Sequence, residues 1–250
     1  MAKIGTTTWM ERSGGRLAWN EKLTLIGQGV AARFATQRQR KSGERVRLRE
    51  VSEILPPDSA IACEAVALTQ DCSPPYLFNH CLRAYFWARL LDSDSRPFDD
   101  EALFVALLLH DWGLTERWRL KGRTHECFTA VGAKAAEELA ARHQWGDARA
   151  NLAANAITLH LNVTVGDEHG KEAQMVRTGS GGDVAGLGLG ILERDQIEEV
   201  VARYPRFNMK SEIVDTLMTE TIERPCCRTA FLCRSLGFVN LIQGNRVFTE

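Results

Sequence analysis

The chain has 250 residues, of which 44% are hydrophobic, enough for one domain with a sizeable buried core. Its 31 Lys and Arg and 32 Asp and Glu leave a formal charge of -1, so no global field attracts nucleic acid or anionic lipid. The longest unbroken apolar run, residues 102–109, has eight residues, far short of the roughly twenty that cross a bilayer. We therefore expect no nucleic-acid partner and no membrane span.

The first residues lack the apolar core and cleavage site of a secretory signal, which predicts a cytoplasmic protein. The seven cysteines form no C-x-x-C pair, so reduced, buried thiols are expected rather than disulfides or cysteine-bound zinc. The near-neutral charge favours a small-molecule substrate. Composition leaves the oligomeric state open, with a homo-oligomer among the options.

Residues 1–46 are polar, rich in Gly and Arg and weakly periodic, so we predict an N-terminal arm or peripheral segment there and one helical domain over 47–250. Seven basic residues lie between positions 33 and 49. No aromatic platform is interleaved with them, which favours a solvated face over a nucleic-acid site.

Beyond Pro57 the chain shows helical periodicity and no period-two strand pattern. The predicted helices cover about 58–69, 75–91, 99–112 (closed by Gly113 as a left-handed cap), 124–143 (with Thr124 as N-cap) and 147–161. A polar loop over 162–174 and a Gly-rich apolar segment over 175–192 follow, and then helices over about 193–203, 209–222 and 226–241. This pattern predicts an all-α helical bundle.

The informative residues are ionisable groups in apolar helices. His80 lies within LFNHCLRAYFWARLL, and the pair His110-Asp111 ends ALFVALLLHD; both segments are too apolar for surface helices. Either feature alone is explained by a hydrogen-bonded core histidine or by a helix cap. Their joint placement needs a further explanation.

The two helices are joined by a short loop and should pack antiparallel. His80 lies eleven residues before Leu91, and His110 lies eleven after Asp99. At about 1.5 Å rise per residue, both histidines should lie roughly 16 Å from the connecting turn. The sequence therefore predicts that they converge.

An ionised aspartate buried at that point needs a positive partner, and neither apolar stretch offers a lysine or arginine directly beside Asp111. A divalent cation would supply the charge. Imidazole and carboxylate ligands suit Zn best here, with Fe or Mn as alternatives, and leave positions open for water.

These residues resemble a known family. The spacing of His80, His110-Asp111 and a later aspartate is similar to the HD superfamily of metal-dependent hydrolases. The ordered strings FNHCLRAYFWA, ALFVALLLHDWGLTE, AVGAKAAEEL, AITLH and GSGGDVAG resemble its cyanamide hydratase-like branch over about residues 70–245. The resemblance implies an HD-domain helical bundle over 47–250 in which His80, His110, Asp111 and Asp183 hold one metal. Asp167 and Asp195 also lie downstream.

Further histidines lie between the HD pair and the last aspartate, as in superfamily members that hold two metals. His125 and His160 are therefore candidates for a second metal or for substrate binding. His160, or else Glu116 just beyond HDWGLT, is the candidate proton carrier. Three aromatic side chains are expected to cap the pocket: Phe78, Trp87 and Trp112.

The branch implies hydratase chemistry, the addition of metal-activated water to a small C≡N group, or a related hydrolysis. A second reading is a phosphohydrolase acting on a small phosphoester or nucleotide, which would need inward-facing cations. Its candidates are Arg83, Arg117, Arg119, Lys121 and Arg123. A di-iron oxygenase would need His125 and His160 as ligands, and a non-catalytic helical binding module would keep the site without turnover.

Overall fold

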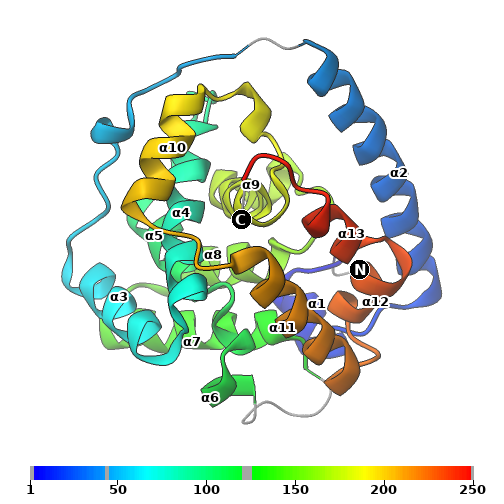
Figure 1. The fold of residues 1–250 in the computed structure, drawn as a ribbon. Helices are drawn as coiled ribbons and strands as arrows, with labels where there is room; N and C mark the ends of the chain where they lie inside the picture. Colours follow the sequence, from blue (N-terminus) through cyan, green and yellow to red (C-terminus); the bar gives the residue numbers. More distant parts are fainter. Residues whose placement is uncertain (1–2, 43–44, 120–125, 249–250) are drawn as a thin grey trace.

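The computed structural model describes the chain except residues 1–2, 43–44, 120–125 and 249–250, and it leaves the side chains of 33–42 undescribed. The described residues form thirteen α-helices, four short 3-10 turns and no strand, which confirms the predicted all-α fold (Figure 1). The helices are α1 (Thr7–Ser13), α2 (Trp19–Ser42), α3 (Ala60–Cys72), α4 (Pro75–Leu90), α5 (Asp100–Leu109), α6 (Glu116–Arg119), α7 (Phe128–Arg142), α8 (Asp147–Leu159), α9 (Lys171–Ala185), α10 (Arg194–Arg203), α11 (Met209–Glu223), α12 (Arg228–Ser235) and α13 (Phe238–Gln243).

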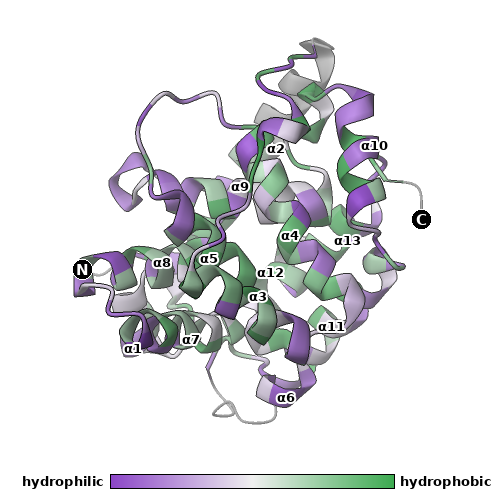
Figure 2. Ribbon diagram, turned by 90° about the vertical axis from the view of Figure 1, so that its left-hand side faces the viewer, coloured by the Kyte–Doolittle hydropathy of each residue, from purple (hydrophilic) through white to green (hydrophobic). Residues whose placement is uncertain are grey.

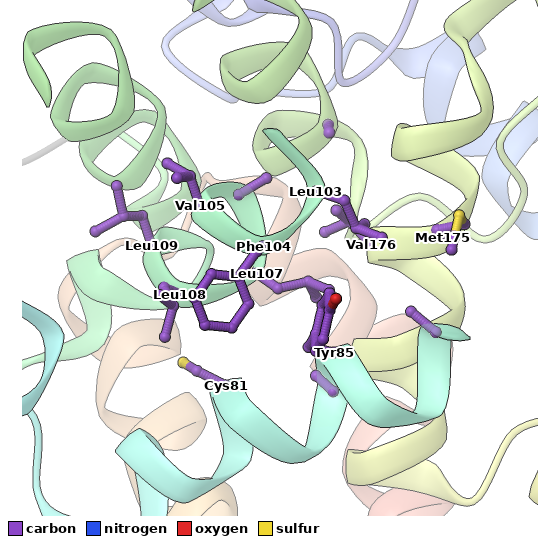
Figure 3. Close-up of a cluster of buried hydrophobic side chains, with 14 of the residues drawn as sticks. Cys81, Tyr85, Leu103, Phe104, Val105, Leu107, Leu108, Leu109, Met175 and Val176 are labelled. Atoms are coloured by element: carbon purple, nitrogen blue, oxygen red, sulfur yellow. The ribbon is translucent and has the colours of Figure 1, made fainter. Parts of the chain in front are cut away.

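The centre of the bundle is α5, which packs against α4, α8 and α9. Every residue of α5 from Ala102 to Leu109 is buried, because this helix is apolar on all sides. Figure 3 shows Phe104 and Leu107 of α5 close to Tyr85 of α4, and Val176 of α9 closing the cluster. Figure 2 shows the hydrophobic segments gathered in the interior, with hydrophilic ones outside.

Helix α9 was not predicted, because its glycines suggested an irregular segment. A Cβ at Gly179 would lie only 2.1 Å from the carbonyl oxygen of Ala84, so the backbones of α9 and α4 approach closely. Close packing offsets the low helix propensity of glycine. Because Gly179 has no side chain, α9 can lie close to α4, and Asp183, one turn further along α9, therefore lies next to α4.

Three predicted helix boundaries were wrong. Helix α5 ends at Leu109, and Gly113 belongs to a 3-10 turn over Trp112–Leu114 rather than a left-handed cap. A Cβ at Gly113 would lie 2.3 Å from the carbonyl oxygen of Phe128, so the absence of a side chain at Gly113 allows the two backbone segments to approach each other closely.

Helix α7 begins at Phe128, and the proposed cap Thr124 lies outside the described residues. The last predicted helix is divided into α12 and α13 by Gly237, whose φ is +67°.

The N-terminal region forms two helices on the outside of the bundle, where α2 follows one edge of the molecule (Figure 1). Trp9 and Met10 of α1 and Leu25 of α2 are nevertheless buried, in a second apolar cluster with Met209 and Ile213 of α11. The first 46 residues, predicted as an arm or peripheral segment, thus contribute to a buried core. Among the described helices, none combines the length and apolar character that would span a membrane.

Candidate metal centre

Two packed helices supply the central residues. His80 lies in the middle of α4, and His110 and Asp111 follow the last residue of α5. All three side chains are buried; Asp111 is 5% exposed and the two histidines are fully enclosed. The predicted convergence is therefore present in the fold, since two antiparallel helices of known rise place both histidines at one height.

The distances define a compact triangle. His80 Nε2 lies 3.0 Å from His110 Nε2, and Asp111 Oδ2 lies 3.3 Å from the former and 3.5 Å from the latter. Metal–ligand bonds of roughly 2.0–2.2 Å would place neighbouring tetrahedral ligand atoms about 3.3–3.6 Å apart. Two sides of the triangle have this length and the side between the two histidines is shorter, so the triangle is close in size to one face of a metal coordination shell.

The other ring nitrogen of each histidine fixes its tautomer. His110 Nδ1 lies 2.7 Å from the carbonyl oxygen of Leu107, and His80 Nδ1 lies 2.8 Å from Asp183 Oδ2. Because a carbonyl or carboxylate oxygen only accepts, each Nδ1 donates, and each neutral ring keeps its lone pair on Nε2. Two lone pairs and one carboxylate thus converge on one point, which is the donor set a divalent metal requires.

His160, the C-cap of α8, completes this arrangement. Its Nδ1 donates to the carbonyl oxygen of Ile157 at 2.7 Å, so its Nε2 also carries a lone pair, 3.6 Å from Asp111 Oδ1. The ring stands edge-on to His110 with a centroid distance of 4.9 Å. His160 is buried like the other members of the cluster.

Burial decides the charge of the histidines. It lowers the pKa of His110, and it lowers the pKa of His160 to about 3, so both rings are neutral at pH 7 and able to act as ligands. Burial also lowers the pKa of His80, but hydrogen bonds to Asp111 and Asp183 outweigh it and raise the pKa.

The structure places Asp183 on the opposite side of the His80 ring. Its carboxylate accepts five hydrogen bonds: two from Arg83 at 2.8 Å each, and one each from Trp87 at 2.7 Å, Arg206 at 3.2 Å and His80 at 2.8 Å. Within the described part of the chain, the group whose ligand atoms lie close enough together to hold an ion comprises His80, His110 and Asp111. Asp183 contacts His80 from behind that group, and its role as a fourth ligand stays a prediction.

The described residues among the remaining candidates are not part of this cluster. Glu116 is exposed at the start of α6, and His125 lies outside the described residues. Asp195 pairs with Arg47 on the surface, and the exposed Asp167 accepts a hydrogen bond from Gln174.

The expected aromatic cap is only partly present. Trp112 is nearly buried and its ring packs against Trp118 at 4.8 Å. Phe78 is partly buried against the main core cluster. Trp87 faces Asp183 instead, because residues 80, 83 and 87 lie on one face of α4. That spacing of polar groups in an apolar helix was the available signal for the support around Asp183.

Comparison with protein families matches residues 77–201 to the HD domain, 125 of the 250 residues. The chain therefore belongs to the HD-domain family, whose members are typically metal-dependent hydrolases that bind divalent metals. His80, His110, Asp111, His160 and Asp183 all lie within the matched range. A search of curated proteins found no match to the chain.

Proposed function

We propose that this chain is a metal-dependent hydratase that adds activated water to a small molecule with a C≡N group, as the resemblance to the cyanamide hydratase-like branch implies. The observation that carries the proposal is the convergence of the Nε2 lone pairs of His80 and His110 on the Asp111 carboxylate. Among the described residues, the ion pairs that involve Asp111 are all with histidines. A divalent cation fits this donor set, with Zn the best candidate.

When bound, such a metal supplies Lewis acidity that polarises a small substrate and makes water acidic near neutral pH. The protein supplies rigid placement: His80 is held by Asp183 and His110 by the backbone of Leu107. Fixed outer partners of this kind orient ligands and raise their basicity. The ligand set is therefore pre-organised before substrate arrives.

His160 is the proposed proton carrier. Its Nδ1 is committed to Ile157, so only Nε2, on the side of Asp111, can take up a proton from water. Phe128 packs against the ring at a centroid distance of 5.8 Å and restricts solvent around it. Glu116 is exposed on α6, which makes it the weaker candidate for this role.

The surroundings favour an uncharged substrate over a phosphoester. Arg83 is committed to Asp183, Arg117 pairs with Asp71 on the surface, and Arg119 pairs with Glu223. Phosphate recognition would need cations directed at the centre. The other two cations considered, at positions 121 and 123, lie outside the described residues.

Metal analysis tests the site. We expect about one equivalent of divalent metal in the wild type and a loss of most of it in His110→Ala. His143→Ala is the matched control, because His143, the C-cap of α7, pairs with Glu64 of α3 rather than with a residue of the cluster, and its removal should leave the metal content unchanged. Equal metal content in wild type and His110→Ala would exclude the proposed centre.

A substrate panel then tests the reaction. Cyanamide, a small aliphatic nitrile and bis(p-nitrophenyl) phosphate are offered to the metal-loaded wild type and to His160→Ala. We expect turnover of a C≡N compound and a fall of about 10²–10⁴-fold in kcat without His160. Turnover of the phosphodiester alone would favour the phosphohydrolase. An iron absorption spectrum would favour the di-iron oxygenase, and bound metal with no turnover of any compound a non-catalytic module.

A further inference from the structure

An aromatic residue distant in sequence packs on the side chains that surround Asp183. Phe248 is 5% exposed and belongs to the main core cluster together with Trp87. The guanidinium carbon of Arg206 lies 3.9 Å from the centroid of the Phe248 ring, and the centroids of the Trp87 and Phe248 rings are 6.1 Å apart. Phe248 thus contacts two side chains that come from separate parts of the fold.

These two side chains share one acceptor. Trp87 Nε1 donates to Asp183 Oδ1 at 2.7 Å, and Arg206 donates to the same oxygen at 3.2 Å and to the backbone carbonyl oxygen of Asp183 at 3.3 Å. The other carboxylate oxygen, Oδ2, accepts from His80 Nδ1 at 2.8 Å. One oxygen of this carboxylate therefore binds a histidine of the metal centre, and the other binds the two donors on which Phe248 packs.

Hydrogen bonds fix the segment that carries Phe248 against the last turn of α9. The Asn245 side chain is buried; it donates to the carbonyl oxygen of Val184 at 3.3 Å and accepts from the backbone nitrogen of Val247 at 3.0 Å. Gly186, the C-cap of α9, has φ +70°, and a Cβ there would lie 2.6 Å from Asn245 Oδ1. The segment is therefore held at the end of the helix that carries the carboxylate.

The Phe248 ring has two physical effects on this network. A guanidinium within about 6 Å of an aromatic centroid is attracted to the ring face, so Phe248 favours the position in which Arg206 donates to Asp183. The ring also covers the donors: Arg206 is 6% exposed and Asp183 is fully buried. Hydrogen bonds are stronger where water is excluded, so this cover stabilises the hydrogen bonds to the carboxylate.

We propose that Phe248 is a positioning residue of the metal centre. By packing on Trp87 and Arg206 it keeps the Asp183 carboxylate in place, and Asp183 in turn fixes the ring of His80 for metal binding. Partners behind a histidine ligand are typically worth about 10–100-fold in metal affinity. The inference rests on the metal centre proposed above, and it adds a residue that lies outside the range matched to the HD domain.

Hydrogen exchange in the metal-free protein tests the first step. The indole N–H of Trp87 donates to Asp183, so its exchange with D2O, followed by NMR of the full chain, measures how often this network opens. In Phe248→Ala we expect exchange about 3–30-fold faster than in the wild type, as the loss of a desolvated cation–π contact implies. The indole N–H of Trp9, which donates to Glu21, is the internal reference and should exchange at the wild-type rate.

Zinc titration against a competing chelator tests the second step. Arg83 still donates to Asp183 in Phe248→Ala, so we expect a partial loss of zinc affinity, about tenfold. Val247→Ala is the matched control, because Val247 lies in the same segment and is partly buried against the same core. Its side chain lies next to Gly186, so this variant should bind zinc as tightly as the wild type.

A milder variant covers the case in which Phe248→Ala does not fold. Phe248→Leu keeps an apolar side chain without the aromatic face, and it should shift both measurements in the same direction by a smaller factor. Wild-type zinc affinity in the folded Phe248 variants would overturn the proposal even if Trp87 exchanged faster, because the network would then not act on His80. An equal loss of affinity in Val247→Ala would also overturn it. A wild type that binds no zinc would instead overturn the metal centre itself.

Discussion

Two buried aspartates lie on opposite sides of one imidazole ring, and they have opposite environments. Asp183 accepts from His80 Nδ1 and also pairs with Arg83 and Arg206. Asp111 faces His80 Nε2 and two further histidines, with distances of 3.3–3.6 Å to the three Nε2 atoms. One carboxylate has two guanidinium groups around it, and the other has three imidazole rings, of which burial keeps those of His110 and His160 neutral.

We propose that this difference distinguishes Asp111 as a metal ligand from Asp183 as the carboxylate that orients His80; the prediction of Asp183 as a fourth ligand stays untested. The charges of Arg83 and Arg206 and the hydrogen bond from His80 hold the pKa of Asp183 well below its usual range, against the effect of burial. Its charge is therefore already balanced by the protein. At Asp111 the balance is incomplete, and a divalent cation would complete it. Proximity to a histidine does not distinguish the two roles, whereas the supply of positive charge does.

The largest expected effect follows from removing the balanced carboxylate. Asp183→Ala leaves two buried guanidinium groups without their anion, so we expect the free energy of unfolding to fall by about 3–5 kcal/mol. Urea unfolding followed by circular dichroism measures it. Asp195→Ala is the control, because the exposed Asp195–Arg47 pair should contribute at most about 1 kcal/mol. Similar losses in both variants would mean that Asp183 does not have this structural role.

A smaller effect is expected from the helix contact that places Asp183. In Gly179→Ala the new methyl group would lie 2.1 Å from the backbone oxygen of Ala84, so α9 must move away from α4. We expect a loss of about 1–3 kcal/mol, despite a gain in helix propensity of about 1 kcal/mol. Gly190→Ala is the matched control, since a Cβ there meets no atom within 4 Å. Equal stability of the two variants would show that α4 and α9 tolerate a wider spacing.

The sequence predicted how His80 lies relative to His110, because this arrangement depends on regular helix geometry within a short stretch of chain. Helix rise and a short loop determine where His80 and His110 lie, so their convergence could be calculated from residue counts. The sequence also predicted that α5 is buried, because a continuous apolar run is stable only in the hydrophobic core. The family resemblance supplied Asp183 as a candidate but not its surroundings.

The other side of His80 depends on contacts between distant segments. Trp87 and Asp183 are 96 positions apart, and no local pattern pairs them. The sequence did not predict helix α9, because its glycines have a low helix propensity. The close contact with α4 compensates for this low propensity. The burial of Trp9 and Met10 was missed for the same reason: the polar character of residues 1–46 gave no sign of the cluster on α11 that they cover.

Among these variants, we expect Asp111→Asn to show the smallest change in the free energy of unfolding and a large loss of bound metal. In Asp111→Asn the amide keeps the shape of the carboxylate and can donate to a histidine Nε2 lone pair, so we expect the metal-free protein to change by less than about 1 kcal/mol in urea unfolding. Metal content should nevertheless fall by most of an equivalent, because the only anionic ligand of the triangle is gone. At Asp111 we therefore expect a large loss of metal with little loss of stability. If Asp111→Asn instead retained its metal and lost about 3 kcal/mol or more, as expected when a buried ion pair is broken, Asp111 would be the structural carboxylate and the assignment of the two sides would have to be reversed.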